Sequence, residues 1–193
     1  MDYNDRTALI VVDVQNDFAD PEGALYVQDG ERVVEVINRE VDRAVSAGAL
    51  VVYTQDWHNE VTPHFAPHGG TWPVHGVQGK WGAALHPDLE VRGPSVRKGM
   101  GDDDGYSGFS EHNLASGLVD QTPLETMLRE RRVHKVVVVG LATDYCVRAT
   151  ALDAAARGFE VTVLREAIRA VNLEPGDDAA ALRDMEKAGV VAE

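Results

Sequence analysis

The single cysteine of this 193-residue chain stands where a thiol could act as a nucleophile. Four consecutive valines, 136–139, predict a buried parallel strand that Gly140 ends, because such a β-branched run is too short for a helix. A helical pattern then runs to Gly158, with Thr143 as the expected N-cap and Cys146 in the first turn. The helix dipole and free N–H groups there are expected to lower the thiol pKa and to hold an oxyanion. A lone cysteine is more often a small core residue, so other residues must decide.

Two further residues could make this thiol reactive. Asp13 follows the apolar run 7–12, and a carboxylate at the end of a buried strand is costly without partners. Lys98 follows a short predicted strand, 95–97. Taken singly, they fit a turn-capping aspartate and a solvated lysine. Together they give the thiol a proton acceptor, Asp13, and a cation that keeps Asp13 ionised and lowers the thiol pKa. Because no histidine stands beside them, the pattern favours a Cys–Asp–Lys arrangement over Cys–His.

A possible metal site lies at the end of the second predicted strand and in the loop 59–92 that follows. Asp56 and His58 are two residues apart, so on an extended backbone they point the same way. The loop adds three more histidines: His64, His68 and His75. Carboxylate and imidazole ligands without thiolate suit Zn²⁺, Fe²⁺ or Mn²⁺. The alternative is a set of surface histidines, although long loops in compact domains are usually functional.

The elements that must position these groups alternate along the chain. We predict strands at 7–12, 49–54, 95–97, 136–139, 160–164 and 189–192, and helices at 31–47, 122–131, 143–157 and 174–188. Thr122 and Glu125 form a predicted capping box with Pro123 at the first helical position. This alternation indicates an α/β fold in which helices cover both faces of a parallel sheet, with 1–193 as one domain. Asp13, Asp56, Lys98 and the Cys146 loop each follow the C-terminal end of a strand, where open α/β sheets bind ligands.

Composition narrows the classes of protein to consider. The net charge of −14 argues against nucleic acid and anionic membrane as partners. We expect no membrane span and no signal peptide, because no apolar run is long enough and the N-terminus lacks a basic region. One cysteine excludes an internal disulfide and a multi-thiolate zinc site. A cytoplasmic location is therefore the expectation.

Six motifs in order resemble the nicotinamidase/pyrazinamidase branch of the isochorismatase-like cysteine hydrolases, over essentially the whole chain. They are VDVQNDF (12–18), DWH (56–58), WPVH (72–75), KG (98–99), YSGF (106–109) and GLATDYC (140–146). The resemblance implies a three-layer α/β/α sandwich with a six-stranded, mainly parallel sheet.

The resemblance also implies roles for residues. Asp13, Lys98 and Cys146 match the family's catalytic triad. The matching metal ligands are Asp56, His58 and His75, with His64 a ligand in only some members. The aromatic walls of the substrate pocket match Phe18, Trp72 and Tyr106. The family's cis peptide would fall at Leu141–Ala142, and it would aim the N–H groups of Ala142 and Cys146 at the carbonyl oxygen.

The activity implied by this resemblance is hydrolysis of nicotinamide to nicotinic acid and ammonia in NAD salvage, with pyrazinamide also accepted. Cys146 would form a thioester, and a divalent metal would orient the pyridine ring, with zinc expected before iron or manganese. Two alternatives stay open: an amidase of the superfamily acting on an acyclic amide or carbamoyl compound, and a non-catalytic small-molecule or metal-binding protein. The chain departs from the family at Gly76, where many members have a second cysteine, and in the acidic run 102–104, which is expected to alter the pocket rim. A homo-oligomer is left open.

Overall fold

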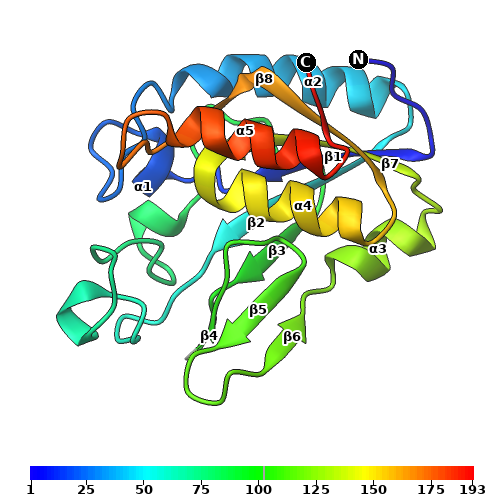
Figure 1. Ribbon diagram of the computed structural model, residues 1–193. Helices are drawn as coiled ribbons and strands as arrows, with labels where there is room; N and C mark the ends of the chain where they lie inside the picture. Colours follow the sequence, from blue (N-terminus) through cyan, green and yellow to red (C-terminus); the bar gives the residue numbers. More distant parts are fainter. Residues whose placement is uncertain (102) are drawn as a thin grey trace.

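The computed structural model describes residues 1–101 and 103–193, and a six-stranded sheet forms its centre (Figure 1). Its strands, in spatial order, are β3 (Ser95–Lys98), β2 (Leu50–Asp56), β1 (Thr7–Val12), β7 (Lys135–Leu141), β8 (Glu160–Arg169) and β9 (Val191–Ala192). Each strand runs parallel to its neighbours. The predicted six-stranded parallel sheet is therefore confirmed.

The two most apolar strands, β1 and β7, are adjacent at the middle of the sheet. Their register pairs Leu9 with Val137 and Val12 with Gly140. Every residue of β1 is buried, as expected for a strand that is covered on both faces. Gly140 is required at this point, because its φ is +114° and a Cβ there would collide with the Val12 carbonyl. β8 runs past its predicted end at Leu164, after an irregularity in its pairing with β7.

Helices cover both faces of this sheet. The helices are α1 (Asn16–Ala19), α2 (Arg32–Ser46), α3 (Leu124–Glu130), α4 (Arg148–Ala156) and α5 (Asp177–Lys187). Leu9 and Val11 of β1 pack into the cluster that contains the apolar residues of α1 and α2. Ile10 and Val12 point the other way, into the cluster that contains those of α3, α4 and α5. In Figure 1, α4 and α5 lie side by side on that face, in front of the sheet. The predicted three-layer α/β/α sandwich is confirmed.

A second, smaller sheet was not predicted. It has three antiparallel strands, β4 (Asp103–Asp104), β5 (Ser110–Asn113) and β6 (Val119–Gln121), and it projects below the main sheet in Figure 1. Residues 59–92 form a long irregular segment, as predicted, and its helical content is two 3₁₀ turns at Ala66–His68 and Trp81–Ala83. Residues 59–92 follow β2 and the small sheet follows β3, so both leave the main sheet at the carboxyl ends of its strands.

Two predicted helix caps are wrong. The Thr122 hydroxyl accepts the Leu124 N–H at 3.2 Å, but the N–H of Thr122 donates to a backbone carbonyl, so Glu125 does not close a capping box. The segment with the cysteine is capped at Ala142 rather than Thr143. Residues Thr143–Val147 form one π-helical turn that continues into α4, and its wider hydrogen-bond spacing moves the cap one residue earlier.

The carboxyl ends of β1, β2, β3 and β7 lie at one edge of the sheet, because adjacent parallel strands point the same way. Asp13, Asp56, Lys98 and the cysteine turn are therefore brought together from distant parts of the chain. Within the described ranges, no helix is long and apolar enough to cross a membrane.

Candidate active site

Asp13 is fixed at the end of β1 in a fully buried position. Its backbone has φ of +48°, a left-handed conformation that is uncommon outside glycine and that often marks functional sites. The Thr54 hydroxyl donates to Asp13 Oδ1 at 2.6 Å and accepts the Asp13 N–H at 3.2 Å. Thr54 lies on β2, beside β1, so the neighbouring strand holds both the backbone and one carboxylate oxygen. The second oxygen, Oδ2, is left for the residues of the site.

Lys98 is the cation of this site and is fully buried at the end of β3. Its ammonium lies 2.9 Å from Asp13 Oδ2, pairs with Asp56 Oδ1, donates to the Gly105 carbonyl at 3.2 Å and approaches Cys146 Sγ to 3.5 Å. Burial alone would lower the pKa of Lys98, but the two carboxylates outweigh it and raise that pKa well above its usual value. Lys98 is therefore charged. The structure brings Asp13, Lys98 and Cys146 together, and their catalytic roles stay predictions.

Cys146 lies in the π-helical turn with 7% of its surface exposed. The Cys146 Sγ lies within 4.8 Å of a carboxylate oxygen of Asp13 and of one of Asp56. The predicted direction of its pKa shift is wrong: burial raises the pKa of the thiol well above its usual value, although Lys98 opposes this shift. Burial also raises the pKa of Asp13, again against Lys98. Burial thus favours the protonated form of the thiol, and Asp13 lies nearby as the candidate acceptor of its proton.

The backbone before the cysteine has the predicted form. The peptide bond Leu141–Ala142 is cis, as the resemblance implied. Both Ala142 and Cys146 line the pocket, while the N–H groups of Tyr145 and Val147 donate to the Ala142 carbonyl at 3.1 and 3.0 Å. The oxyanion role of the Ala142 and Cys146 amides stays a prediction.

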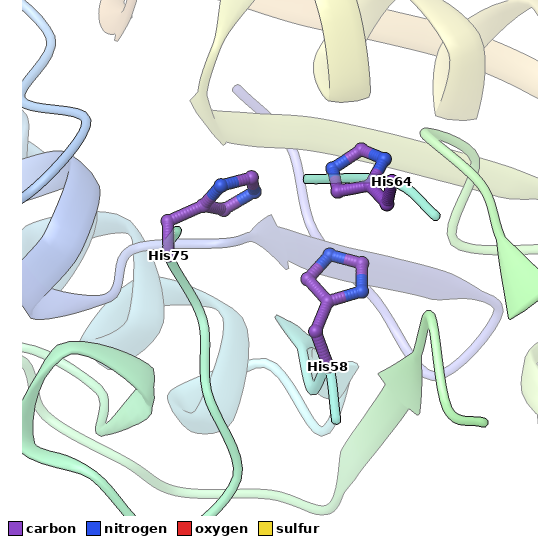
Figure 2. Close-up of side chains that lie close together, drawn as sticks. All are labelled: His58, His64 and His75. Atoms are coloured by element: carbon purple, nitrogen blue, oxygen red, sulfur yellow. The ribbon is translucent and has the colours of Figure 1, made fainter. Parts of the chain in front are cut away.

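Three histidines gather beside this grouping, with one ligand atom of each within 4.8 Å of the others. Figure 2 shows the rings of His58, His64 and His75 turned toward a common centre. Each ring uses its Nδ1 to contact an acceptor: His58 the Gly99 carbonyl at 3.0 Å, His75 the Pro73 carbonyl at 2.7 Å, and His64 a carboxylate at 2.8 Å. Because these acceptors cannot donate, Nδ1 carries the proton and Nε2 is left with its lone pair.

Asp56 joins the histidines to the catalytic group. Its Oδ1 pairs with Lys98, whereas Oδ2 lies 3.9 Å from His58 Nε2 and 3.7 Å from His75 Nε2. Burial would raise the pKa of Asp56, but Lys98 first, and then His58 and His75, hold it well below its usual value. The carboxylate is therefore ionised, as a metal ligand must be.

These residues fit a divalent metal ion. Among the described residues, His58 Nε2 is a buried nitrogen with no hydrogen-bond partner, which is costly unless something else binds it. Ligand atoms around a tetrahedral ion with bonds of about 2.1 Å lie roughly 3.4 Å apart. Asp56 Oδ2 lies 3.9 Å from His58 Nε2 and 3.7 Å from His75 Nε2, which is close to this value. A small inward movement of these side chains would therefore form the site. His64 belongs to the same cluster, whereas His68 is exposed and lies outside it.

A pocket with about 440 Å³ of empty space, its open mouth included, is lined by Cys146 and by two of the histidines, His64 and His75. The predicted aromatic residues Phe18, Trp72 and Tyr106 line it, and the Trp72 Nε1–H donates to the Tyr106 hydroxyl at 3.0 Å. Tyr145 also lines it, with its ring centroid 5.0 Å from that of Trp72. The lining thus combines aromatic and aliphatic side chains with the carboxylates of Asp13, Asp56 and Asp104.

Sequence reasoning missed several residues that touch this site. Thr54 and Tyr145 belong to a strand and a motif that were identified, but nothing in their spacing marked them. Of the acidic run, Asp104 lies on the pocket rim and contacts His64, as that departure from the family suggested, while Asp102 lies outside the described residues. Gly76, at φ of +56°, has its N–H bonded to Asp17 Oδ2 at 2.8 Å.

Both the sequence and the fold of this chain match those of known proteins. Residues 7–193 match the family described as the Isochorismatase domain. The nicotinamidase of Escherichia coli is 38% identical over 200 residues, covering 94% of this chain and 92% of that protein. The pyrazinamidase of Pyrococcus horikoshii, solved in complex with zinc, is 40% identical, with a TM-score of 0.86 and coverage of 97% and 98%. PnC1 of L. infantum, solved in complex with nicotinate, is 37% identical, with a TM-score of 0.89 and coverage of 100% and 95%.

Proposed function

This chain belongs to the isochorismatase family, and on that premise we propose that it is a nicotinamidase, an amidohydrolase that converts nicotinamide and water to nicotinic acid and ammonia. The observation that carries the proposal is a pocket lined by the Cys146 thiol and the buried Asp13 carboxylate, with the Lys98 ammonium in contact with both and a histidine cluster beside them. Pyrazinamide, a pyridine-like carboxamide of similar shape, is the second expected substrate. The reaction would serve NAD salvage.

In the proposed mechanism, Cys146 is the nucleophile and Asp13 is the base. As Sγ bonds to the carboxamide carbon, the thiol proton passes to Asp13, and the carbonyl oxygen becomes an oxyanion held by the amides of Ala142 and Cys146. Asp13 then gives that proton to the departing nitrogen, so that ammonia leaves and a thioester remains. Asp13 next takes a proton from water, whose oxygen attacks the thioester carbon. The C–S bond then breaks, Asp13 returns the proton to Sγ, and nicotinic acid leaves the regenerated thiol.

Lys98 acts on this cycle through charge. Its contact of 2.9 Å with Asp13 Oδ2 favours the ionised carboxylate before proton transfer, and its approach of 3.5 Å to Sγ favours the thiolate that forms during transfer. Burial raises the pKa of Cys146, and Lys98 lowers it only in part. The thiolate therefore forms as Asp13 takes the proton.

For the metal site we propose zinc, with iron or manganese as alternatives, held by Asp56, His58 and His75 and also by His64. When bound, the ion would supply a Lewis-acid partner for the pyridine nitrogen and so orient the ring. Phe18, Trp72 and Tyr106 would flank that ring, leaving its carboxamide directed at Cys146.

Three further expectations belong to the proposal. Residues 1–193 form one domain, which the single main sheet supports, since its strands extend from Thr7 to Ala192. The partner is a small pyridine carboxamide, not nucleic acid or membrane. The cytoplasmic location stays a prediction, and assembly into a homo-oligomer stays open.

The direct test is to incubate the zinc-loaded protein with nicotinamide and to measure ammonia and nicotinate together. We expect both products in equal amounts, with pyrazinamide also converted. A panel of acyclic amides and carbamoyl compounds is assayed in parallel. Faster turnover of any of these than of nicotinamide would assign the protein to another amidase of the family, and no turnover of any amide would indicate a binding protein.

A further inference from the structure

His64 differs from the other two histidines of the site in the partner of its Nδ1. His58 and His75 each direct Nδ1 at a backbone carbonyl, whereas His64 directs Nδ1 at the carboxylate of Asp104, with Oδ2 at 2.8 Å. His64 is buried and the Asp104 side chain is 21% exposed, so this is not a loose surface pair.

A carboxylate in this place has a definite effect on the imidazole. It fixes the proton on Nδ1, leaves the Nε2 lone pair free, and holds the plane of the ring. It also makes Nε2 a stronger electron donor than a neutral carbonyl partner would. Figure 2 shows His64 facing His58 and His75, so the nitrogen that Asp104 leaves free is the one available to an ion at their centre.

The small antiparallel sheet explains how Asp104 comes to lie there. Asp104 ends β4, where it is paired with His112 of β5. The next residue, Gly105, passes so close to Ser110 that a Cβ would lie 2.7 Å from its carbonyl oxygen, and the Gly105 carbonyl accepts a hydrogen bond from Lys98 at 3.2 Å. The Gly105 N–H donates to Asp104 Oδ1 at 2.7 Å, which holds the carboxylate with Oδ2 toward His64.

We propose that Asp104 is the positioning residue of the metal site, acting through His64 to make that histidine a ligand. The inference rests on the proposed metal site. It adds that the Asp104 carboxylate, presented by β4 of the small sheet, strengthens ion binding. Asp103 offers a matched control, because its Oδ1 accepts from Asn113 Nδ2 at 2.8 Å instead.

The experiment measures Zn²⁺ affinity by competition with a chromogenic chelator, in the whole chain, for Asp104→Ala, Asp104→Asn, His64→Ala and the Asp104→Ala/His64→Ala double variant. Asp103→Asn removes the same charge one residue away. Losing such an outer partner typically weakens metal binding about 10–100-fold. We expect that loss for Asp104→Ala, a smaller one for Asp104→Asn, whose amide oxygen still accepts from Nδ1, and less than about twofold for Asp103→Asn.

The double variant decides whether Asp104 acts through His64. We expect Asp104→Ala to cost nothing more once His64 is alanine, because residues acting through one another are not additive. An equal loss in both backgrounds would overturn the proposal by showing that Asp104 acts directly or through its charge alone. Thermal unfolding of the metal-free variants checks that the fold is intact; if Asp104→Ala is unfolded, Asp104→Asn carries the test.

The same variants separate failure of this inference from failure of the proposed metal site. If His64→Ala weakens Zn²⁺ binding and Asp104→Ala does not, Asp104 has no positioning role and the metal site stands. If His64→Ala leaves the affinity unchanged, His64 is not a ligand and the inference falls with that part of the proposed function.

Discussion

Replacing Lys98 by methionine tests whether one buried ammonium organises the active site. Methionine keeps an unbranched side chain but has no charge, so Lys98→Met removes the contacts to Asp13, Asp56, Gly105 and Cys146 together. Asp13 and Asp56 are 1% and 6% exposed, so bulk water compensates poorly for the lost ammonium. The variant therefore leaves two buried carboxylates without their shared cation.

The size of the effect follows from that burial. Breaking a buried ion pair by removing one partner costs about 3–5 kcal/mol, because the remaining charge is uncompensated. For a domain of this length, 1 kcal/mol corresponds to about 2–4 °C in Tm, so we expect a fall of about 6–20 °C. Without Lys98, only the Thr54 hydrogen bond still opposes the burial that raises the pKa of Asp13. A protonated Asp13 cannot act as base, which should lower kcat/KM by about 10²–10⁴.

The assay is calorimetric unfolding of metal-free protein, with nicotinamide hydrolysis measured at low temperature, where the variant stays folded. Lys80→Met is the control, since Lys80 is exposed and lies 3.8 Å from the exposed Glu60. An exposed pair of this kind contributes about 0–1 kcal/mol, so its Tm should change by no more than about 4 °C. If Lys98→Met behaved like Lys80→Met, the ammonium would not be what holds the two carboxylates ionised.

Three other predictions follow from the same geometry. Asp13→Asn should lower turnover by about 10²–10⁴ and slow iodoacetamide labelling of Cys146, because an amide cannot accept the thiol proton; equal labelling rates in variant and parent would contradict this. Gly99→Ala should weaken Zn²⁺ binding more than Gly101→Ala, since both have positive φ but only a Cβ at Gly99 collides with the His58 ring; equal losses would reduce the effect to backbone strain. Benzamide should be a poorer substrate than nicotinamide by roughly a hundredfold, because a site built around a polar partner rejects an analogue that lacks it; comparable kcat/KM values would count against orientation through the ring nitrogen.

The centre of the main sheet could be predicted because β1 and β7 are apolar along almost their whole length. The valines of β7 and the apolar run of β1 are buried on both faces, so their composition alone identifies them. The small sheet could not be predicted, because its strands are only two to four residues long and largely polar. Such strands carry neither an apolar run nor a clear alternation, and they exist because tertiary contacts hold them.

The sequence likewise predicted only some of the residues that form the candidate site. Residues at strand ends, such as Asp13 and Lys98, could be found because a charged group beside a buried strand is unusual. The acidic run pointed to Asp104 as a rim residue, but its contact with His64 and the position of Tyr145 could not be predicted, since a sheet and a π-helical turn that no local pattern indicates place them. The thiol pKa was predicted in the wrong direction because the sequence shows the neighbouring charge but not the depth of burial.

The central claim is that Cys146 carries the acyl group, and the most direct measurement compares ammonia release from nicotinamide by the parent and by Cys146→Ala, with zinc content determined for both. The thiol is proposed as nucleophile and not as metal ligand, so the variant should keep the zinc content and the fold of the parent. Its turnover should fall by several powers of ten, as is typical when a nucleophile is removed. Ammonia release by the zinc-loaded variant at a rate near that of the parent would contradict the covalent mechanism.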